Sequence, residues 1–212
     1  MNSEKPAAAA PLGYRIRRAA LQDTRRPVLC LHSAVWLHIC AYMTRIALLS
    51  DTHGHLDERI VHYLEGADEI WHAGDFGSAA VVATLEGLAP TFRGVYGNID
   101  GTDVRQTEPL VQDFVVEGLR VLMTHIGGYP GHYAPAARPM LTSLRPGLFV
   151  TGHSHILRVM PDKKLGLLHL NPGAAGRHGF HKVRTLLRFG IDKDKVVELQ
   201  AVELGPRSGT VL

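Results

Sequence analysis

Seven side chains of the types that bind divalent metal ions follow five short apolar segments of the sequence. They are Asp51, His53, Asp75, Asn98, His125, His153 and His155. Carboxylate, carboxamide and imidazole groups without a thiolate suit Mn²⁺, Fe²⁺ or Zn²⁺ and argue against an all-sulfur structural zinc site. Any one of the seven taken alone fits a structural role better, and only the joint pattern favours a metal site. Because residues i and i+2 of a strand project from the same face, we expect Asp51 with His53, and His153 with His155, to point into one site.

The segments that must position these side chains alternate between strand-like and helix-like patterns. Expected strands cover residues 45–50, 69–72 and 91–96, and expected helices run from an Asp57 cap to Gly66 and from a Ser78 cap through residues 81–88. Gly74, Gly97 and Gly152 come at strand ends, where we expect the chain to turn sharply. Polar residues at the carboxyl end of each strand indicate a layered α/β protein whose site lies along one sheet edge.

The second half of the chain is richer in strands. They are expected at residues 111–116, 120–124, 148–150, 156–160, 165–170, 185–189 and 195–202, with one helix at residues 136–144. Residues 117–119 carry a hairpin signal between the first two of these strands. Asn171-Pro172-Gly173 is interpreted as a turn.

The composition is that of an ordinary globular protein. The chain has 212 residues, with 23 Lys and Arg against 20 Asp and Glu, 13 His, and only 2 Cys. Together with only 22 Gly and 12 Pro and with 45% hydrophobic residues, the low number of Cys excludes collagen-like, disulfide-scaffold and disordered classes. Residues 1–42 hold six basic side chains against two acidic ones, and both cysteines. Residues 43–212 therefore hold 17 basic against 18 acidic side chains and no thiol, so the basic character of the whole chain does not belong to the expected domain.

Residues 1–42 are predicted to be an extension that is disordered or dispensable, with Met43 as a natural start. The apolar run at residues 27–42 is shorter than the roughly 18 to 20 residues of a membrane span. A signal peptide is the alternative, but the run lies far from the N-terminus and no Ala-x-Ala site follows it. We therefore expect a cytoplasmic protein with no membrane partner, a domain at residues 43–205 and a short tail at residues 206–212.

The order of the polar motifs resembles that of the calcineurin-like metallophosphoesterases. The sequence has Asp-x-His at residue 51, Gly-Asp at 74, Gly-Asn-x-Asp at 97, a lone His125, and Gly-His-x-His at 152. The match spans residues 43–205 and looks most like the small bacterial and archaeal phosphodiesterases of the family. Each motif is a weak signal alone, but five in the family's order are highly specific. The resemblance implies an α/β fold in which a layered β-sandwich is flanked by helices.

The resemblance also implies a role for each polar residue. Asp51, His53 and His155 would bind one metal ion, Asn98, His125 and His153 a second, and Asp75 both. The implied cofactors are two divalent ions, with Mn²⁺ favoured and Fe²⁺, Ni²⁺ or Zn²⁺ as alternatives. Two such ions can clamp a phosphate and activate a hydroxide for attack on phosphorus. We expect Asn98 to contact the substrate and stabilise the developing charge, and Asp100 to support catalysis by holding a ligand or a loop.

Two positions depart from the better-known relatives. Ile99 stands where the protein-phosphatase branch has a histidine that protonates the leaving group, which supports the small phosphodiesterase branch and leaves the acid unidentified. Gly127 stands where many relatives have a second histidine, and His132 would replace it only if the glycine-rich loop folds back. His72, two residues before Gly74, is expected to line the wall of the site and contact substrate.

These residues predict a metal-dependent phosphoesterase that hydrolyses a small phosphodiester. The alternatives are a phosphomonoesterase and a metal-binding scaffold of the same fold, because one eukaryotic relative serves mainly in protein assembly. A long nucleic acid is a less favoured substrate, since the expected domain is nearly neutral and shows no basic stripe interleaved with aromatics. The sequence does not fix the oligomeric state, although small relatives of the family often pair into homodimers through apolar strands.

Overall fold

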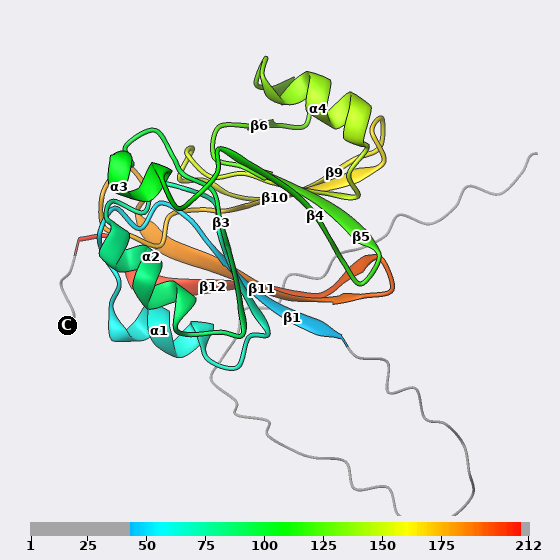
Figure 1. The fold of residues 1–212 in the computed structure, drawn as a ribbon. Helices are drawn as coiled ribbons and strands as arrows, with labels where there is room; N and C mark the ends of the chain where they lie inside the picture. The colour runs from blue at the N-terminus through cyan, green and yellow to red at the C-terminus, as the bar shows by residue number, and fades with distance from the viewer. Residues whose placement is uncertain (1–42, 209–212) are drawn as a thin grey trace, which may run out of the picture.

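Two five-stranded sheets stack face to face in the computed structural model, which describes residues 43–208 (Figure 1). The first sheet has the order β12-β11-β1-β2-β3, with β12 at Lys195–Pro206, β11 at Val183–Asp192, β1 at Thr44–Leu49, β2 at Glu69–His72 and β3 at Thr91–Gly94. The second has the order β4-β5-β8-β10-β9, with β4 at Val111–Val116, β5 at Leu119–Thr124, β8 at Leu148–Val150, β10 at Leu167–Pro172 and β9 at Leu157–Asp162. The predicted helix-flanked β-sandwich is therefore confirmed.

Helices cover the outer faces of both sheets. The helices α1 (Glu58–Leu64) and α2 (Ala79–Glu86) pack on the first sheet, and α4 (Ala137–Leu144) packs on the second (Figure 1). The Asp57 side chain caps α1 as predicted, accepting a hydrogen bond from the backbone N–H of Ile60 at 3.0 Å. Ser78 occupies the cap position of α2, but its side chain makes no capping hydrogen bond.

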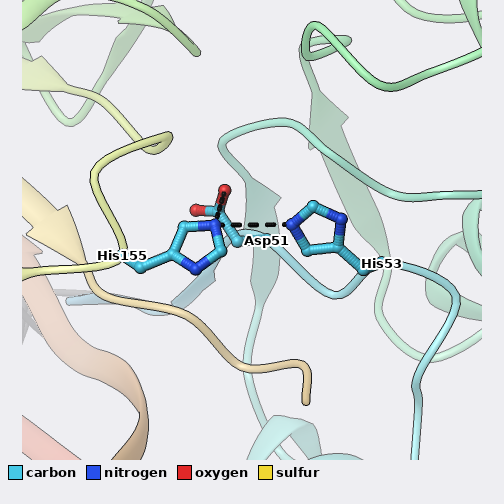
Figure 2. Close-up of side chains that lie close together, drawn as sticks. All are labelled: Asp51, His53 and His155. Atoms are coloured by element: carbon cyan, nitrogen blue, oxygen red, sulfur yellow. Dashed lines mark hydrogen bonds and ion pairs between the residues drawn. The ribbon is translucent and has the colours of Figure 1, made fainter. Parts of the chain in front are cut away.

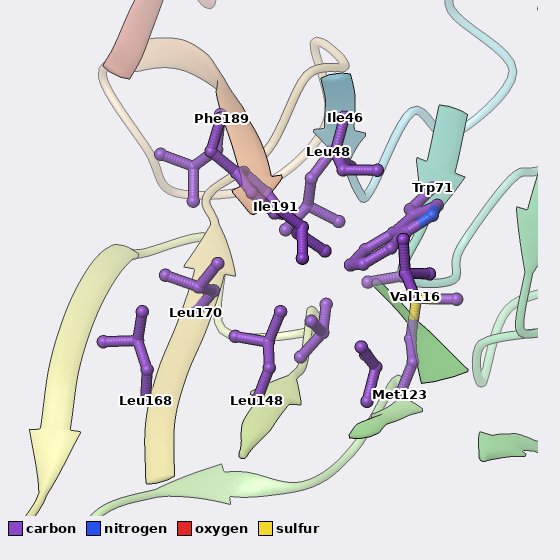
Figure 3. Close-up of a cluster of buried hydrophobic side chains, with 14 of the residues drawn as sticks. Ile46, Leu48, Trp71, Val116, Met123, Leu148, Leu168, Leu170, Phe189 and Ile191 are labelled. Atoms are coloured by element: carbon purple, nitrogen blue, oxygen red, sulfur yellow. The ribbon is translucent and has the colours of Figure 1, made fainter. Parts of the chain in front are cut away.

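The core lies between the sheets and is built by alternation along each strand. In β1, Ile46 and Leu48 point into the sandwich (Figure 3). Ala47 and Leu49 belong to a second cluster, outside the sandwich and under the helices. Trp71 of β2 is fully buried in the same central cluster as Ile46 and Leu48. A strand that is buried on both faces needs apolar residues at every position, which explains the continuous apolar run of β1.

Parallel pairing brings the carboxyl ends of several strands to one edge. Leu49 of β1 pairs with His72 of β2, and His72 pairs with Gly94 of β3. In the second sheet, Met123 of β5 pairs with Val150 of β8, also in parallel. The loops that follow these five strands therefore lie at the same edge of the sandwich. They carry the polar motifs of the sequence.

Several elements differ from the sequence-based prediction. Leu119 belongs to β5, because the hairpin turn uses only Glu117 and Gly118, both with positive φ. Asn171 and Pro172, interpreted as a turn, close the strand β10. The short helix α3 (Thr102–Arg105) and the small hairpin of β6 (Gly128–Tyr129) and β7 (His132–Tyr133) were not expected in their glycine-rich and polar surroundings. Among residues 43–208, no helix is long and apolar enough to cross a membrane.

Candidate metal centre

Two clusters of potential metal ligands lie at the edge of the sandwich where the polar loops meet. One consists of Asp51, His53 and His155, which approach one another from two separate loops (Figure 2). The other consists of Asp75, His125 and His153. In each cluster the candidate ligand atoms lie within 4.8 Å of one another, which is close enough to surround a single ion. Six of the seven predicted ligands are thus brought together in two groups.

The backbone at these ligands is not extended, so the same-face argument for residues i and i+2 is wrong. Asp51, His53, Asp75, His153 and His155 all follow the ends of their strands and have φ between 48° and 66°. Left-handed backbone is uncommon for residues other than glycine. Asp51 and His53 still meet, but His153 and His155 divide between the two clusters, because the turn at each residue redirects its side chain.

Asp75 lies between the clusters and faces both. Its Oδ1 lies 3.2 Å from Nε2 of His125, and its Oδ2 lies 3.7 Å from Nε2 of His53. The backbone N–H of Ile99 donates to Oδ1 at 3.1 Å, which fixes the orientation of the carboxylate. The side chain is almost completely buried. A carboxylate with one oxygen toward each cluster has the geometry of a bridging ligand.

Two of the candidate ligand atoms are buried without a hydrogen-bond partner, as expected where a metal ion binds. Oδ1 of Asp51 and Nε2 of His125 are buried and form no hydrogen bond. They do lie near other ligand atoms, with Asp51 Oδ1 at 3.1 Å from Nε2 of His155, but without hydrogen-bond geometry. Buried polar atoms normally have partners. A cation held among these atoms would supply the missing partner, so the residues present suit a metal.

Hydrogen bonds on the far side of the His125 and His155 imidazoles turn Nε2 of each ring toward the other candidate ligand atoms. Nδ1 of His125 donates to the carbonyl oxygen of Ala73 at 2.7 Å. His181 donates from Nε2 to the carbonyl oxygen of Gly176 at 3.1 Å, so its Nδ1 accepts the Nδ1–H of His155 at 3.3 Å. Such outer partners fix the tautomer and the ring orientation of a metal ligand. Sequence reasoning left His181 without a role, because only the folded loop brings it behind His155.

Burial and neighbouring charges shift the ionisation of the candidate ligands. Burial lowers the pKa of His53 below its usual value, against the opposing charges of Asp75 and Asp51, which favours the neutral, metal-binding imidazole. Burial alone would raise the pKa of Asp75, but the close approach of the His125 imidazole, with the backbone N–H of Ile99, holds it below its usual value. Asp75 is therefore ionised at neutral pH.

Asp100 holds two loops of the site together and does not face the pocket. It is 3% exposed, and its two carboxylate oxygens accept the N–H groups of Gly77 at 2.8 Å and of Gly97 at 2.7 Å. Gly77 follows Asp75 by two residues, and Gly97 precedes Asn98. This position agrees with the expected role of Asp100 in holding a loop.

Gly97 is required for the space that it leaves to Asp75. Its φ is not positive, but a Cβ atom there would collide with Oδ1 and the backbone nitrogen of Asp75. Gly74 is required both for its backbone conformation and for space, since its φ is +97° and a Cβ atom there would overlap the ring of His125. Left-handed backbone is therefore not the reason for a glycine at position 97, and the close approach to Asp75 explains the residue.

The clusters form the floor of an open pocket of about 570 Å³. Asn98, the seventh predicted ligand, is exposed and lines this pocket beside His53, Asp75, His153 and His155. Ile99 and His178 line it as well. Asn98 is thus positioned to reach a ligand in the pocket.

Two predicted substrate contacts lie away from the pocket lining. His72 is fully buried behind the site, stacked on Phe76 with ring centroids 3.8 Å apart, and bonded through Nε2 to the hydroxyl of Thr52 at 3.0 Å. Burial holds its pKa well below the usual value. His132 lies in the small hairpin, where its ring contacts Tyr129. Neither belongs to the pocket lining, because β2 keeps His72 in the core and the glycine-rich loop does not fold back over the clusters.

Comparison with known proteins agrees with this geometry. The sequence profile described as the calcineurin-like phosphoesterase superfamily domain matches residues 44–194. The chain belongs to this superfamily. A probable metallophosphoesterase of Methanothermobacter thermautotrophicus is 31% identical over 136 residues, which are 61% of this chain and 76% of that protein.

Solved structures of this calcineurin-like fold superimpose on the chain. A structure described as a novel archaeal phosphodiesterase has a TM-score of 0.60 at 21% identity and covers 75% of this chain and 99% of its own. Vps29 of Entamoeba histolytica, solved as a single mutant, has a TM-score of 0.59 at 16% identity and covers 75% and 98%. A predicted phosphoesterase of Streptococcus pneumoniae has a TM-score of 0.58 at 19% identity, covering 77% and 91%. At these identities the likeness establishes the fold.

Proposed function

We propose that this calcineurin-like protein is a phosphodiesterase that uses two divalent metal ions, Mn²⁺ in the first instance. Asp51, His53 and His155 would hold one ion, and Asn98, His125 and His153 the other. The observation that carries the proposal is Asp75, whose carboxylate oxygens face one cluster each. When bound, such ions polarise phosphoryl oxygens and activate water as a nucleophile.

The chain's own residues would orient the substrate and the ligands. Asn98 lies in the pocket, where its amide would donate to a phosphoryl oxygen and stabilise charge that grows during the reaction. The hydrogen bonds to Ala73 and His181 keep the imidazoles of His125 and His155 aligned. His72 and His132 lie away from the pocket lining, so their predicted substrate contacts are not part of this proposal.

Hydrolysis of two chromogenic esters tests the proposal. The purified protein, reconstituted with Mn²⁺, should hydrolyse bis(p-nitrophenyl) phosphate faster than p-nitrophenyl phosphate, and metal analysis should give two ions per chain. Asp75→Ala should abolish activity and lower the metal content. Asp113→Ala is the matched control, because Asp113 forms only an exposed pair with Arg120. A preference for the monoester would favour a phosphomonoesterase.

A protein-assembly scaffold is the second candidate, because Vps29 structures are among the structural neighbours. The two hypotheses differ in what the metal residues do. If neither ester is hydrolysed with Mn²⁺, Fe²⁺, Ni²⁺ or Zn²⁺, the enzyme hypothesis fails and the scaffold is favoured. The homodimer and the cytoplasmic location remain predictions, which gel filtration and fractionation would test.

A further inference from the structure

Three exposed apolar side chains surround the opening of the metal-ligand pocket. Ile99 is 46% exposed, Ile156 is 52% exposed and Phe180 is 104% exposed, and all three line the pocket. We call them the apolar rim. A single exposed apolar residue needs no explanation, but three around one pocket indicate a surface that binds something apolar.

The apolar rim is assembled from three separate loops. Ile99 follows Asn98 after β3, Ile156 follows His155 after β8, and Phe180 precedes His181 in the segment between β10 and β11. Each rim residue is thus next to a residue that ligates or orients a ligand in the proposed centre. Whatever occupies the rim is held a short distance from the proposed metal ions.

Within the part of the chain that the structure describes, the pocket lining contains neither lysine nor arginine. Apart from Asp75, its polar members are Asn98, Ser154 and five histidines. No cationic side chain among the described residues of the lining is therefore available to pair with a second phosphate group, as Lys and Arg side chains normally do where polyphosphates bind. A phosphodiester carries one negative charge, which would face the proposed metal ions. Its two ester groups can then contact the walls of the pocket.

The pocket lining also presents the flat faces of two side-chain rings, those of His178 and Phe180. The exposed imidazole of His178 lies beside the ring of His53, with centroids 5.0 Å apart, and the Phe180 ring is open to solvent. Flat side chains pack well against another ring. Apolar side chains at the opening, above a floor of polar groups, suit a ligand that has both an apolar group and a charged group.

Building on the proposed function, we infer that the substrate is a phosphodiester with at least one uncharged, ring-sized apolar ester group, which the apolar rim binds. Phe180 and Ile156 are then specificity-determining residues that contact this group. The phosphoryl group would lie over the ligand clusters, and the ring would lie against the side chains of the rim.

Two esters with the same leaving group isolate the rim's contribution. Bis(p-nitrophenyl) phosphate and methyl p-nitrophenyl phosphate both release p-nitrophenol and differ only in the group that stays on phosphorus. For the wild type, kcat/KM should be higher for the diaryl ester. Phe180→Ala should lower the diaryl-to-methyl ratio of kcat/KM about five- to tenfold, as expected for losing the burial of part of a ring. Because Phe180 is fully exposed, this substitution leaves the core intact.

Binding without turnover gives an independent readout. Calorimetric titration of the Mn²⁺-loaded protein with diphenylphosphinate, whose P–C bonds a phosphodiesterase does not hydrolyse, should show an affinity that Phe180→Ala weakens by a similar factor, and Ile156→Ser should act in the same direction. Val115→Ala is the control, since Val115 is 59% exposed in β4 but lies outside the pocket lining. It should leave both the ratio and the affinity unchanged.

The outcomes separate this inference from the proposed function. A wild-type protein that hydrolyses both esters, with a ratio that Phe180→Ala and Ile156→Ser leave within twofold, would overturn the role of the rim and leave the phosphodiesterase standing. A protein that hydrolyses neither ester would overturn both. A ratio lowered in the rim variants and unchanged in Val115→Ala supports the inference.

Discussion

Replacing Asp100 by asparagine separates a loop-holding role from a direct role in catalysis. The carboxylate is 3% exposed and accepts one backbone N–H on each oxygen, from Gly77 at 2.8 Å and from Gly97 at 2.7 Å. Asparagine keeps the shape but has only one acceptor oxygen, so its amide NH₂ would face one of the two N–H groups. One charge-assisted bond is lost and a buried donor loses its partner.

The magnitude of the effect follows from these two losses. Both losses concern the same bond, so the cost in the free energy of unfolding is about 3 kcal/mol, the upper end of the roughly 1.5 to 3 kcal/mol of a hydrogen bond to a charged group and of the roughly 1 to 3 kcal/mol of an unpaired buried donor. For a domain of this size, about 3 kcal/mol corresponds to a fall in Tm of about 6 to 12 °C. Because the two loops carry Asp75 and Asn98, the affinity for the second ion should also fall, by about tenfold or more.

Thermal unfolding followed by circular dichroism at pH 7, together with titration by Mn²⁺, measures both effects. Asp103→Asn is the matched control, because the exposed Asp103 accepts a single bond from the N–H of Ala79 at 3.2 Å, and its Tm should change by less than about 2 °C. An Asp100→Asn protein with wild-type Tm and metal affinity but a large loss of kcat and an altered pH profile would refute the loop-holding role. Asp100 would then act on the substrate itself.

Three further predictions concern space, charge and chain length. Gly97→Ala should lower the affinity for metal and the activity more than it lowers Tm, because the new Cβ pushes against Asp75; wild-type metal binding in this variant would contradict the packing argument. Burial, with the charges of Glu86 and Asp100, raises the pKa of Glu108 from 4.5 to about 7, so its contribution to stability is full below pH 4.5 and is lost as the pH rises through 7. At pH 8, Glu108→Gln should therefore raise the free energy of unfolding by up to about 3 kcal/mol, and Tm with it, and this gain should disappear near pH 4.5. A variant with the wild-type Tm at both pH 8 and pH 4.5 would contradict the prediction. Deleting residues 1–42 should leave kcat/KM unchanged, because every side chain placed in the site lies between residues 51 and 181, and a loss of activity would show that the extension contributes.

The strand ends were predictable because they depend on local signals. Apolar runs such as residues 45–50 end in polar residues, and parallel pairing then brings those ends to one edge. The same reasoning located Asp51, Asp75 and His125 in the site. Burial of β1 on both faces follows from its continuous apolar sequence.

Other features depend on contacts that sequence patterns do not encode. His72 was expected on the wall of the site, but its position in β2 puts it in the core against Phe76. The support of His155 by His181 arises only when the segment after β10 folds over the site. Residue spacing alone did not predict that His153 and His155 divide between the clusters, because the backbone turns at each residue, although the family resemblance did imply this division.

The left-handed backbone at five of the candidate ligands limits how this site can be moved or redesigned. Each such residue costs about 1 kcal/mol relative to ordinary backbone. Five of them amount to about 5 kcal/mol, comparable to the whole stability of a small domain. The sandwich supplies this energy through its packing, so grafting the same side chains onto the extended strand ends of another scaffold would not reproduce the centre. A designer who wished to transplant it would have to transplant the loops first.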